Sequence, residues 1–313
     1  MKKILAYILD YQRKHFDIKL YLSIALFLVL IFFFNYYYDF ENSVLDRYNG
    51  QFRDGVHMFL FHGIPYLIVC LLLYFFNKQR DWLSSGRFWL MFFIGFTILA
   101  LDRSFYGYVI FKEHFDVRDY VFVSKTVRWL SSTFIVVIPL LIIYMVVERD
   151  DPKIYYGLSP KKFDFKPYLI LLLLAGICVG IGSFFADLQA YYPRYQFSRG
   201  SYFAEQRNLP EAVTVLIYEL AYGSDFVGVE IFFRGFLIFA FSRTLGGYAI
   251  LPMAVTYAVL HFGKPMTEAI SSIFGGYLLG IISYNTRSVW GGIIIHMGIA
   301  WLMEVFGYLH RLL

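Results

Sequence analysis

Seven stretches of the chain contain no Asp, Glu, Lys or Arg over 16 to 23 residues, which restricts the fold more than any other feature. A helix needs about 20 apolar residues to cross the roughly 30 Å hydrocarbon core of a bilayer. The runs are too long and too continuous for barrel strands. The uncharged runs are 20–38, 55–77, 129–147, 167–186, 244–263, 269–286 and 288–303. Two further segments, the shorter run 88–101 and the partly charged 212–242, are also candidate spans. We therefore expect an all-α fold, a polytopic membrane helix bundle of eight to nine transmembrane helices.

The composition supports this prediction and excludes several other classes. Hydrophobic residues make up 59% of the 313 residues and charged residues 16%, whereas soluble domains contain about 25% charged residues. A conventional cytosolic enzyme, a coiled coil and a disordered chain are excluded. The net charge of +5 comes from Lys and Arg in short segments between the apolar runs. This pattern is typical of loops that follow the positive-inside rule, so we expect no nucleic-acid partner.

The distribution of charge also predicts an orientation. The segment before the first apolar run contains three lysines and an arginine within its first 14 residues, and segments 77–87 and 148–166 are also basic. The segment 39–54, on the opposite side if the spans alternate, is mainly acidic. We expect a multi-pass integral protein of a bacterial inner (plasma) membrane, with a cytoplasmic N-terminus and the lipid bilayer as its surroundings.

The polar residues expected at membrane depth divide the chain in two. Residues 1–165 form four accessory spans with few such groups, and residues 166–313 carry nearly all of them. An ionisable group in the bilayer costs at least about 2.5–3.5 kcal/mol, so each should be paired, solvated in a cavity or functional. The main candidates are Glu230, Arg234, His261 and His296.

Each candidate also has a purely structural explanation. Glu230 and Arg234 are spaced i,i+4 in the orientation that favours an ion pair, and such a pair neutralises both charges. His261 lies near the end of an apolar run, where a hydrogen-bonded interfacial histidine is common. His296 lies inside an apolar helix that also contains Gly291 and Gly292, which indicates close helix packing.

The order of these residues resembles the CPBP family, the Rce1-like relatives of CAAX prenyl proteases that are also called the Abi family. The family motifs are EExxxR, FxxxH and HxxxN or a close variant. The corresponding segments here are VEIFFRG at 229–235, YAVLHFGKP at 257–265 and HMGIA at 296–300. The resemblance covers residues 210–305, and the three motifs occur in the family order on separate predicted spans.

The resemblance implies an intramembrane endopeptidase that hydrolyses a peptide bond of a membrane-associated protein or peptide. It implies that Glu230 and His261 activate a water, that His296 stabilises the oxyanion, and that Arg234 forms a structural ion pair with Glu230. Peptide hydrolysis needs such a base and such donors. No metal is required by this scheme. If zinc or another divalent metal takes part, Glu230, His261 and His296 are the expected ligands.

The departures from the motifs leave the activity open. Val229 stands where the first Glu is expected, and Ala300 where an oxyanion donor is expected. Glu230 could replace the missing acid if the helix is locally distorted, or Asp225 could, because it lies four residues before Val229 on the same helical face. Tyr257 replaces the usual Phe and adds a hydroxyl.

Two other functions remain as alternatives. A catalytically inactive CPBP-like pseudoprotease could act as a membrane binding, scaffold or immunity protein. A transporter is less consistent with the sequence, because its polar residues would be expected in two repeated halves rather than in one. The identity of the substrate and the oligomeric state do not follow from the sequence.

Overall fold

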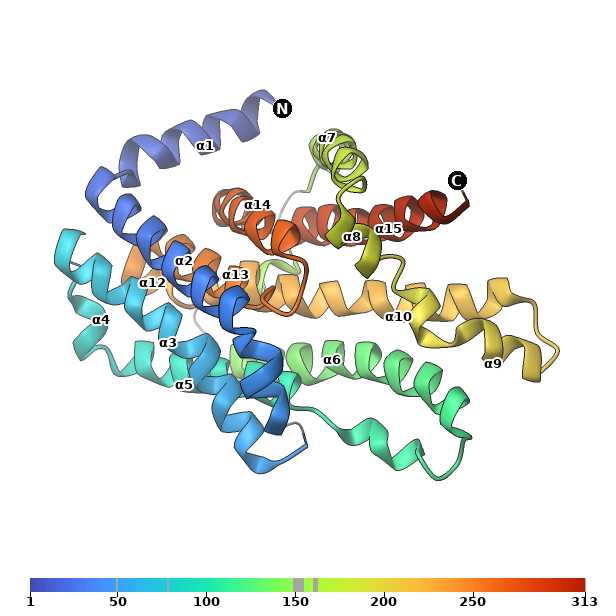
Figure 1. Ribbon diagram of the computed structural model, residues 1–313. Coiled ribbons are helices and arrows are strands. Elements are labelled where there is room, and N and C mark those ends of the chain that lie inside the picture. Colours follow the sequence, from blue (N-terminus) through green and yellow to red (C-terminus); the bar gives the residue numbers. More distant parts are fainter. Residues whose placement is uncertain (49, 78, 149–154, 160–162, 313) are drawn as a thin grey trace. The chain divides into compact units, whose positions relative to one another are not determined.

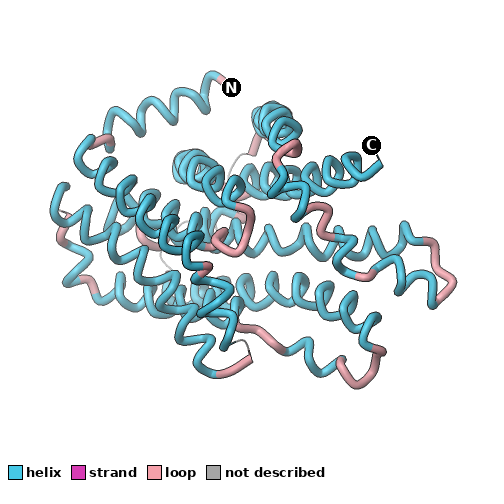
Figure 2. The backbone as a smooth tube through the Cα atoms, viewed as in Figure 1, coloured by secondary structure: helices cyan, strands magenta, loops and turns pink. Residues whose placement is uncertain are grey.

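The computed structural model describes residues 1–48, 50–77, 79–148, 155–159 and 163–312. Throughout these residues the chain forms helices joined by loops, without a strand (Figure 2). The predicted all-helical class is therefore confirmed.

Six helices of the described chain are long and apolar enough to cross a membrane. A seventh candidate is a helix pair, Lys166–Gly182 and Ala186–Gln206, that is bent by 94°. The chain is thus an integral, multi-pass membrane protein, but eight to nine spans are not confirmed. The six single candidates are Ile18–Tyr38, Phe52–Phe76, Gly86–Phe111, Val117–Val147, Met266–Thr286 and Trp290–Leu312.

The segment 244–263 accounts for part of the difference. It forms α12 (Ser242–Leu245), η7 (Gly246–Ala249) and the 10-residue α13 (Ile250–Val259) instead of one long helix. A helix of that length rises only about 15 Å. All ten residues of α13 are buried in protein. Its apolar character therefore reflects a position in the core, because a helix that is hydrophobic on all sides is a buried one.

Close contacts divide the chain into two compact units. The first unit comprises Met1–Ser104, Pro139–Asp164 and Glu230–Gly292. Besides α12, η7 and α13, it contains α1 (Lys2–His15), α2 (Ile18–Tyr38), η1 (Glu41–Leu45), η2 (Asp46–Tyr48), α3 (Phe52–Asn77), α4 (Asp81–Ser84), α5 (Gly86–Arg103), η4 (Tyr155–Gly157), η6 (Ile231–Phe236), α11 (Leu237–Phe239) and α14 (Met266–Thr286). The predicted division at residue 165 stays a prediction.

The core of the first unit forms around α13, which lies beside α2, α3 and α14 (Figure 1). From α2 it receives four residues spaced i,i+4, and this spacing places them on one helical face. The side chain of Asp17 caps α2 by accepting the backbone N–H groups of Lys19 and Leu20. The core residues are Leu20, Ile24, Leu28, Phe32, Val69, Leu73, Leu251, Val255, Ala258, Val259, Phe262 and Ala269.

The second unit comprises Phe105–Ile138, Phe165–Val229 and Ile293–Leu313. An aromatic cluster on α6, α10 and α15 forms its centre, with Ala300 among Phe122, Tyr218, Tyr222 and Phe226. The carboxylate of Glu304 accepts the backbone N–H groups of Arg194 and Tyr195 and so fixes the loop before η5. Its elements are η3 (Gly107–Phe111), most of α6 (Val117–Val147), α7 (Lys166–Gly182), α8 (Ala186–Tyr191), η5 (Tyr195–Ser198), α9 (Gly200–Gln206), α10 (Glu211–Glu230) up to Val229, and α15 (Trp290–Leu312) from Ile293.

Candidate functional site

A buried ion pair lies where α10 passes into the π-helix η6. Arg234 Nη1 is 2.9 Å from Glu230 Oε1, and both side chains are fully buried. The i,i+4 spacing favours this contact. Removing one partner of a buried pair leaves an uncompensated charge, which typically costs about 3–5 kcal/mol. Arg234 and Glu230 therefore hold each other in a single arrangement.

The helix that carries this pair is distorted between Glu230 and Arg234. Glu230 is the last residue of α10, and residues Ile231–Phe236 form a π-helix. A π-helical turn is wider than an α-helical turn and commonly marks a functional position. Because the distortion starts directly after Glu230, the direction of its carboxylate cannot be read from a regular helix.

Two glycines allow other segments to pack closely on this part of the chain. A Cβ on Gly292, in the first turn of α15, would overlap Glu230 Oε2 and would lie 2.9 Å from Glu230 Cδ. A Cβ on Gly235 would lie 2.6 Å from the carbonyl oxygen of Tyr156. The Glu230 carboxylate thus packs against the α15 backbone at Gly292, and η4 packs against η6.

Tyr257 on α13 connects the ion pair with His261. The guanidinium carbon of Arg234 lies 3.8 Å from the centre of the Tyr257 ring, which is a cation–π contact. The rings of Tyr257 and His261 meet edge to face, with their centroids 4.5 Å apart. Glu230, Arg234, Tyr257 and His261 consequently form one continuous chain of contacts, and all four are buried.

The hydrogen bond of His261 fixes its tautomer. Its Nδ1 lies 2.9 Å from the carbonyl oxygen of Tyr257, one helical turn earlier. A carbonyl oxygen only accepts hydrogen bonds, so Nδ1 carries the hydrogen. In the neutral ring, Nε2 is then the nitrogen with the lone pair. This is the arrangement of a histidine that can accept a proton.

The turn that follows His261 is held by the end of α2. Asn35 Nδ2 donates to the carbonyl oxygen of Phe262 at 3.4 Å, and Tyr36 donates to that of Lys264 at 2.9 Å. A Cβ on Gly263 would lie 3.1 Å from Glu41 Oε1. Asn35 and Glu41 are not among the predicted site residues, because nothing in their local pattern shows that they meet a turn more than 220 residues away.

Glu41 is an unusual carboxyl group for a loop between two helices. Burial raises its pKa from the ordinary 4.5 to about 7, despite the opposing effect of the nearby Arg103. Asp46 and Asp39 raise the pKa further by charge repulsion. Glu41 therefore changes its charge near neutral pH, next to the turn that follows His261.

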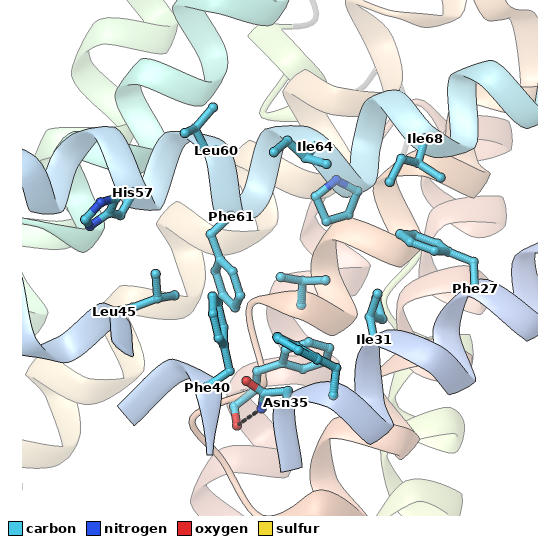
Figure 3. A pocket seen from close by; sticks show the side chains of 14 residues that line it. Phe27, Ile31, Asn35, Phe40, Leu45, His57, Leu60, Phe61, Ile64 and Ile68 are labelled. Carbon is cyan, nitrogen blue, oxygen red and sulfur yellow. Dashed lines mark hydrogen bonds between the residues drawn. The ribbon is translucent and has the colours of Figure 1, made fainter. Parts of the chain in front are cut away.

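An apolar groove between α2 and α3 ends near the same turn (Figure 3). Its volume is about 360 Å³. Val259 and Phe262, on either side of His261 in sequence, contribute to its wall. Its other lining residues are Phe27, Ile31, Phe34, Asn35, Phe40, Leu45, His57, Leu60, Phe61, Ile64, Pro65 and Ile68.

The remaining predicted site residues belong to the second unit. Asp225 is buried on α10, and His296 lies on α15 with its ring centroid 4.4 Å from that of Phe226. Ala300 is buried in the aromatic cluster. The structure thus brings together Glu230, Arg234 and His261 in the first unit and describes Asp225 and His296 separately in the second.

Arg234 would compete with a metal ion for the Glu230 carboxylate. The Glu230 carboxylate is already engaged by the Arg234 guanidinium, whose positive charge opposes a second cation. Within the part of the chain that the structure describes, no group of three His, Cys, Asp or Glu side chains is arranged to hold a metal ion.

Comparison with known proteins agrees with the motifs. Neither the curated proteins nor the solved structures contain a significant match to this chain. A family model matches residues 213–302 of the chain, and this segment includes Glu230, Arg234, His261 and His296. The resemblance predicted from the motifs is thus confirmed: residues 213–302 match the model of the type II CAAX prenyl endopeptidase Rce1-like family.

Proposed function

We propose that the protein is an intramembrane endopeptidase that cleaves a membrane-associated protein or peptide. The observation that carries the proposal is the buried chain of contacts from Glu230 through Arg234 and Tyr257 to His261. Polar groups at this depth are costly and are commonly functional. The family match supports the same class of reaction.

In the proposed reaction, Glu230 and His261 orient one water molecule beside the scissile peptide bond. His261 Nε2 accepts a proton from this water, since Nδ1 is occupied by the Tyr257 carbonyl. Arg234 holds the Glu230 carboxylate in place. We further propose that His296 donates a hydrogen bond to the oxyanion and that Asp225 is the substitute acid if Glu230 is only structural. Positioned proton transfer of this kind contributes about 10²–10⁴-fold to the rate.

The substrate is expected to reach the site from the membrane. The apolar groove provides a surface for a hydrocarbon or apolar segment next to the turn after His261. A substrate anchored in the bilayer could thus lie along α2 and α3 and present its peptide bond near His261. We expect no nucleic-acid partner, and we expect a cytoplasmic N-terminus.

The proposal is tested with the purified full-length protein in detergent, on prenylated and unprenylated peptides. We expect cleavage by the wild type and a loss of at least 100-fold in Glu230→Gln and His261→Ala. Loss of cleavage in His296→Ala would assign His296 to the site. Loss of cleavage in Asp225→Asn but not in Glu230→Gln would show that Asp225 is the acid that the reaction needs. Equal cleavage by the wild type and all four variants would rule out this site.

The alternative is a pseudoprotease that keeps the fold as a membrane binding, scaffold or immunity protein. The ion pair favours it, because a carboxylate that is already bound to Arg234 is less available to a water molecule. Val229 and Ala300 also favour the pseudoprotease, since each replaces a polar residue of the family motifs. A wild-type protein that cleaves no peptide, while remaining folded, would support this alternative.

A further inference from the structure

Positively charged side chains gather around Phe197 in the second unit. Lys125 on α6 donates a hydrogen bond from Nζ to the carbonyl oxygen of Phe197. The guanidinium carbons of Arg194 and Arg311 lie 5.8 and 5.9 Å from the centre of the Phe197 ring. The charges of Arg194 and Arg199 both act on Lys125. We call these four cations, from α6, the segment around η5 and the end of α15, the Phe197 cluster.

The protein does not balance the charge of this cluster. Among the residues that the structure describes, none of the four cations has a carboxylate oxygen within 4 Å. Arg207, in contrast, is paired with Asp119 at 2.7 Å. The carboxylate of Glu304 acts on Arg194 from a greater distance, but it is occupied by the backbone N–H groups of Arg194 and Tyr195. The cluster therefore keeps an excess of positive charge, and cations this close repel each other.

A neutral donor without an acceptor belongs to the same place. Gln196 Oε1 accepts a hydrogen bond from Arg311 Nη1, and because a guanidinium only donates, this contact fixes which end of the amide is the nitrogen. Gln196 Nε2 is buried and has no hydrogen-bond partner in the described part of the chain. A buried donor is destabilising while it lacks an acceptor. An anionic oxygen would satisfy the amide and the cations together.

The lengths of two helices place the cluster at the depth of lipid headgroups. Arg311 lies 21 residues after Trp290 on α15, which is a rise of about 32 Å. Lys125 lies 22 residues before Val147 on α6, a rise of about 33 Å. Both rises match the roughly 30 Å hydrocarbon core. The ends at Val147 and Trp290 adjoin the basic segment expected to be cytoplasmic, so the cluster lies at the opposite layer, where Lys and Arg are usually scarce.

Exposed apolar side chains lie next to the cluster. Leu309 and Leu312 are exposed on α15 beside Arg311. Phe184, which follows α7, is 72% exposed, and its ring centroid lies 4.6 Å from that of His310. Hydrocarbon chains can cover this surface within the bilayer.

We propose that the Phe197 cluster binds the phosphate group of an anionic phospholipid, whose acyl chains lie along α7 and α15. Such a molecule supplies the anionic oxygens that the cations and the Gln196 amide lack, and its chains match the apolar surface beside them. The bound phosphate would tie α6, the segment around η5 and α15 together. The inference is independent of the proposed peptidase reaction, because the cluster contains none of the residues that the reaction uses.

The test is a titration of the full-length protein in nonionic detergent with dioleoylphosphatidylglycerol, followed by native mass spectrometry. We expect this lipid to bind at least about tenfold more tightly than dioleoylphosphatidylcholine, and Arg199→Gln and Arg311→Gln each to weaken its binding about fivefold. Arg118→Gln is the matched control, because Arg118 is an exposed cation near the start of α6 that lies over the Tyr202 ring, outside the cluster. We expect Arg118→Gln to bind the lipid as the wild type does.

Two further probes identify the part of the lipid that is recognised. Glycerol 3-phosphate has the phosphate without the chains, and oleate has a chain with a carboxylate, so we expect each to bind at least about tenfold more weakly than the phospholipid. Equal affinity for either probe would overturn the assignment to a phospholipid phosphate.

The variants also separate a built site from general attraction. If Arg118→Gln weakens lipid binding as much as Arg199→Gln, the cluster is not a site and the inference fails. If Arg311→Gln lowers the melting temperature, Arg199→Gln decides, because the Arg199 side chain makes no hydrogen bond or ion pair among the described residues. Unchanged lipid binding in Arg199→Gln would then overturn the inference.

Discussion

The contact between Glu230 and Gly292 makes one methyl group a direct test of how the ion pair is held. In Gly292→Ala, the new methyl would overlap Glu230 Oε2 and lie 2.9 Å from Cδ. The carboxylate cannot turn toward solvent, because the side chain is fully buried and its Oε1 is bound to Arg234. The methyl must therefore displace the carboxylate from Arg234 or push α15 away from it.

The expected cost follows from three contributions to the free energy of unfolding. Overpacking a buried site costs about 1–3 kcal/mol. Fully separating a buried ion pair costs about 3–5 kcal/mol, of which a partial displacement takes a part. Replacing a helical glycine with alanine stabilises the helix by up to about 1 kcal/mol, which offsets part of this cost. We expect Gly292→Ala to lose about 2–4 kcal/mol.

Gly275→Ala provides the control. It changes the same residue type inside the helix α14, where no atom lies within 4 Å of the added Cβ, so we expect unchanged or slightly higher stability. Unfolding free energies are measured by titrating both proteins in mild detergent micelles with sodium dodecyl sulfate. If the two variants unfold at the same midpoint concentration of sodium dodecyl sulfate, the inferred contact of Glu230 with the α15 backbone is refuted.

Three further variants test the surroundings of the site. Gly235→Ala should lose about 1–3 kcal/mol in the same titration, because its methyl meets the backbone oxygen of Tyr156; wild-type stability would contradict this contact. The raised pKa of Glu41 means that the folded state holds this proton more tightly than the unfolded state. The Glu41 contribution to the free energy of unfolding should therefore fall as pH rises from about 5 to about 7. In Glu41→Gln, this part of the decrease in melting temperature with pH should be absent. An identical pH dependence of the melting temperature in the variant and the wild type would contradict this prediction. Glu230→Leu with Arg234→Met should be more stable than Glu230→Leu alone, which leaves a buried cation, and equal stability would refute the pairing.

The sequence was sufficient for the helical class and for the residues of the ion pair. Long uncharged runs leave helices as the expected structure in a bilayer, and the i,i+4 spacing of Glu230 and Arg234 favours their contact without knowledge of the fold. The motif order also identified the segment that matches the family model. These inferences succeeded because each depends on local sequence alone.

The number of spans and the surroundings of His261 depend on tertiary structure. The segment 244–263 is as apolar as a span, but α13 is buried among other helices, and composition does not distinguish protein from lipid as the surroundings. The contact of Tyr257 with Arg234 and that of Glu41 with the turn at Gly263 join elements distant in sequence. No local pattern predicts such contacts.

The wide turn after Glu230 also determines how the chain would respond to a change in length. Deleting one residue within Ile231–Phe236 would allow the helix to close regularly, but every side chain upstream would rotate by about 100° around the axis. Glu230 would then turn away from Gly292, and a neighbouring position would face that backbone instead. The length of this turn, as well as the type of each residue, therefore decides which side chain of α10 meets the backbone at Gly292.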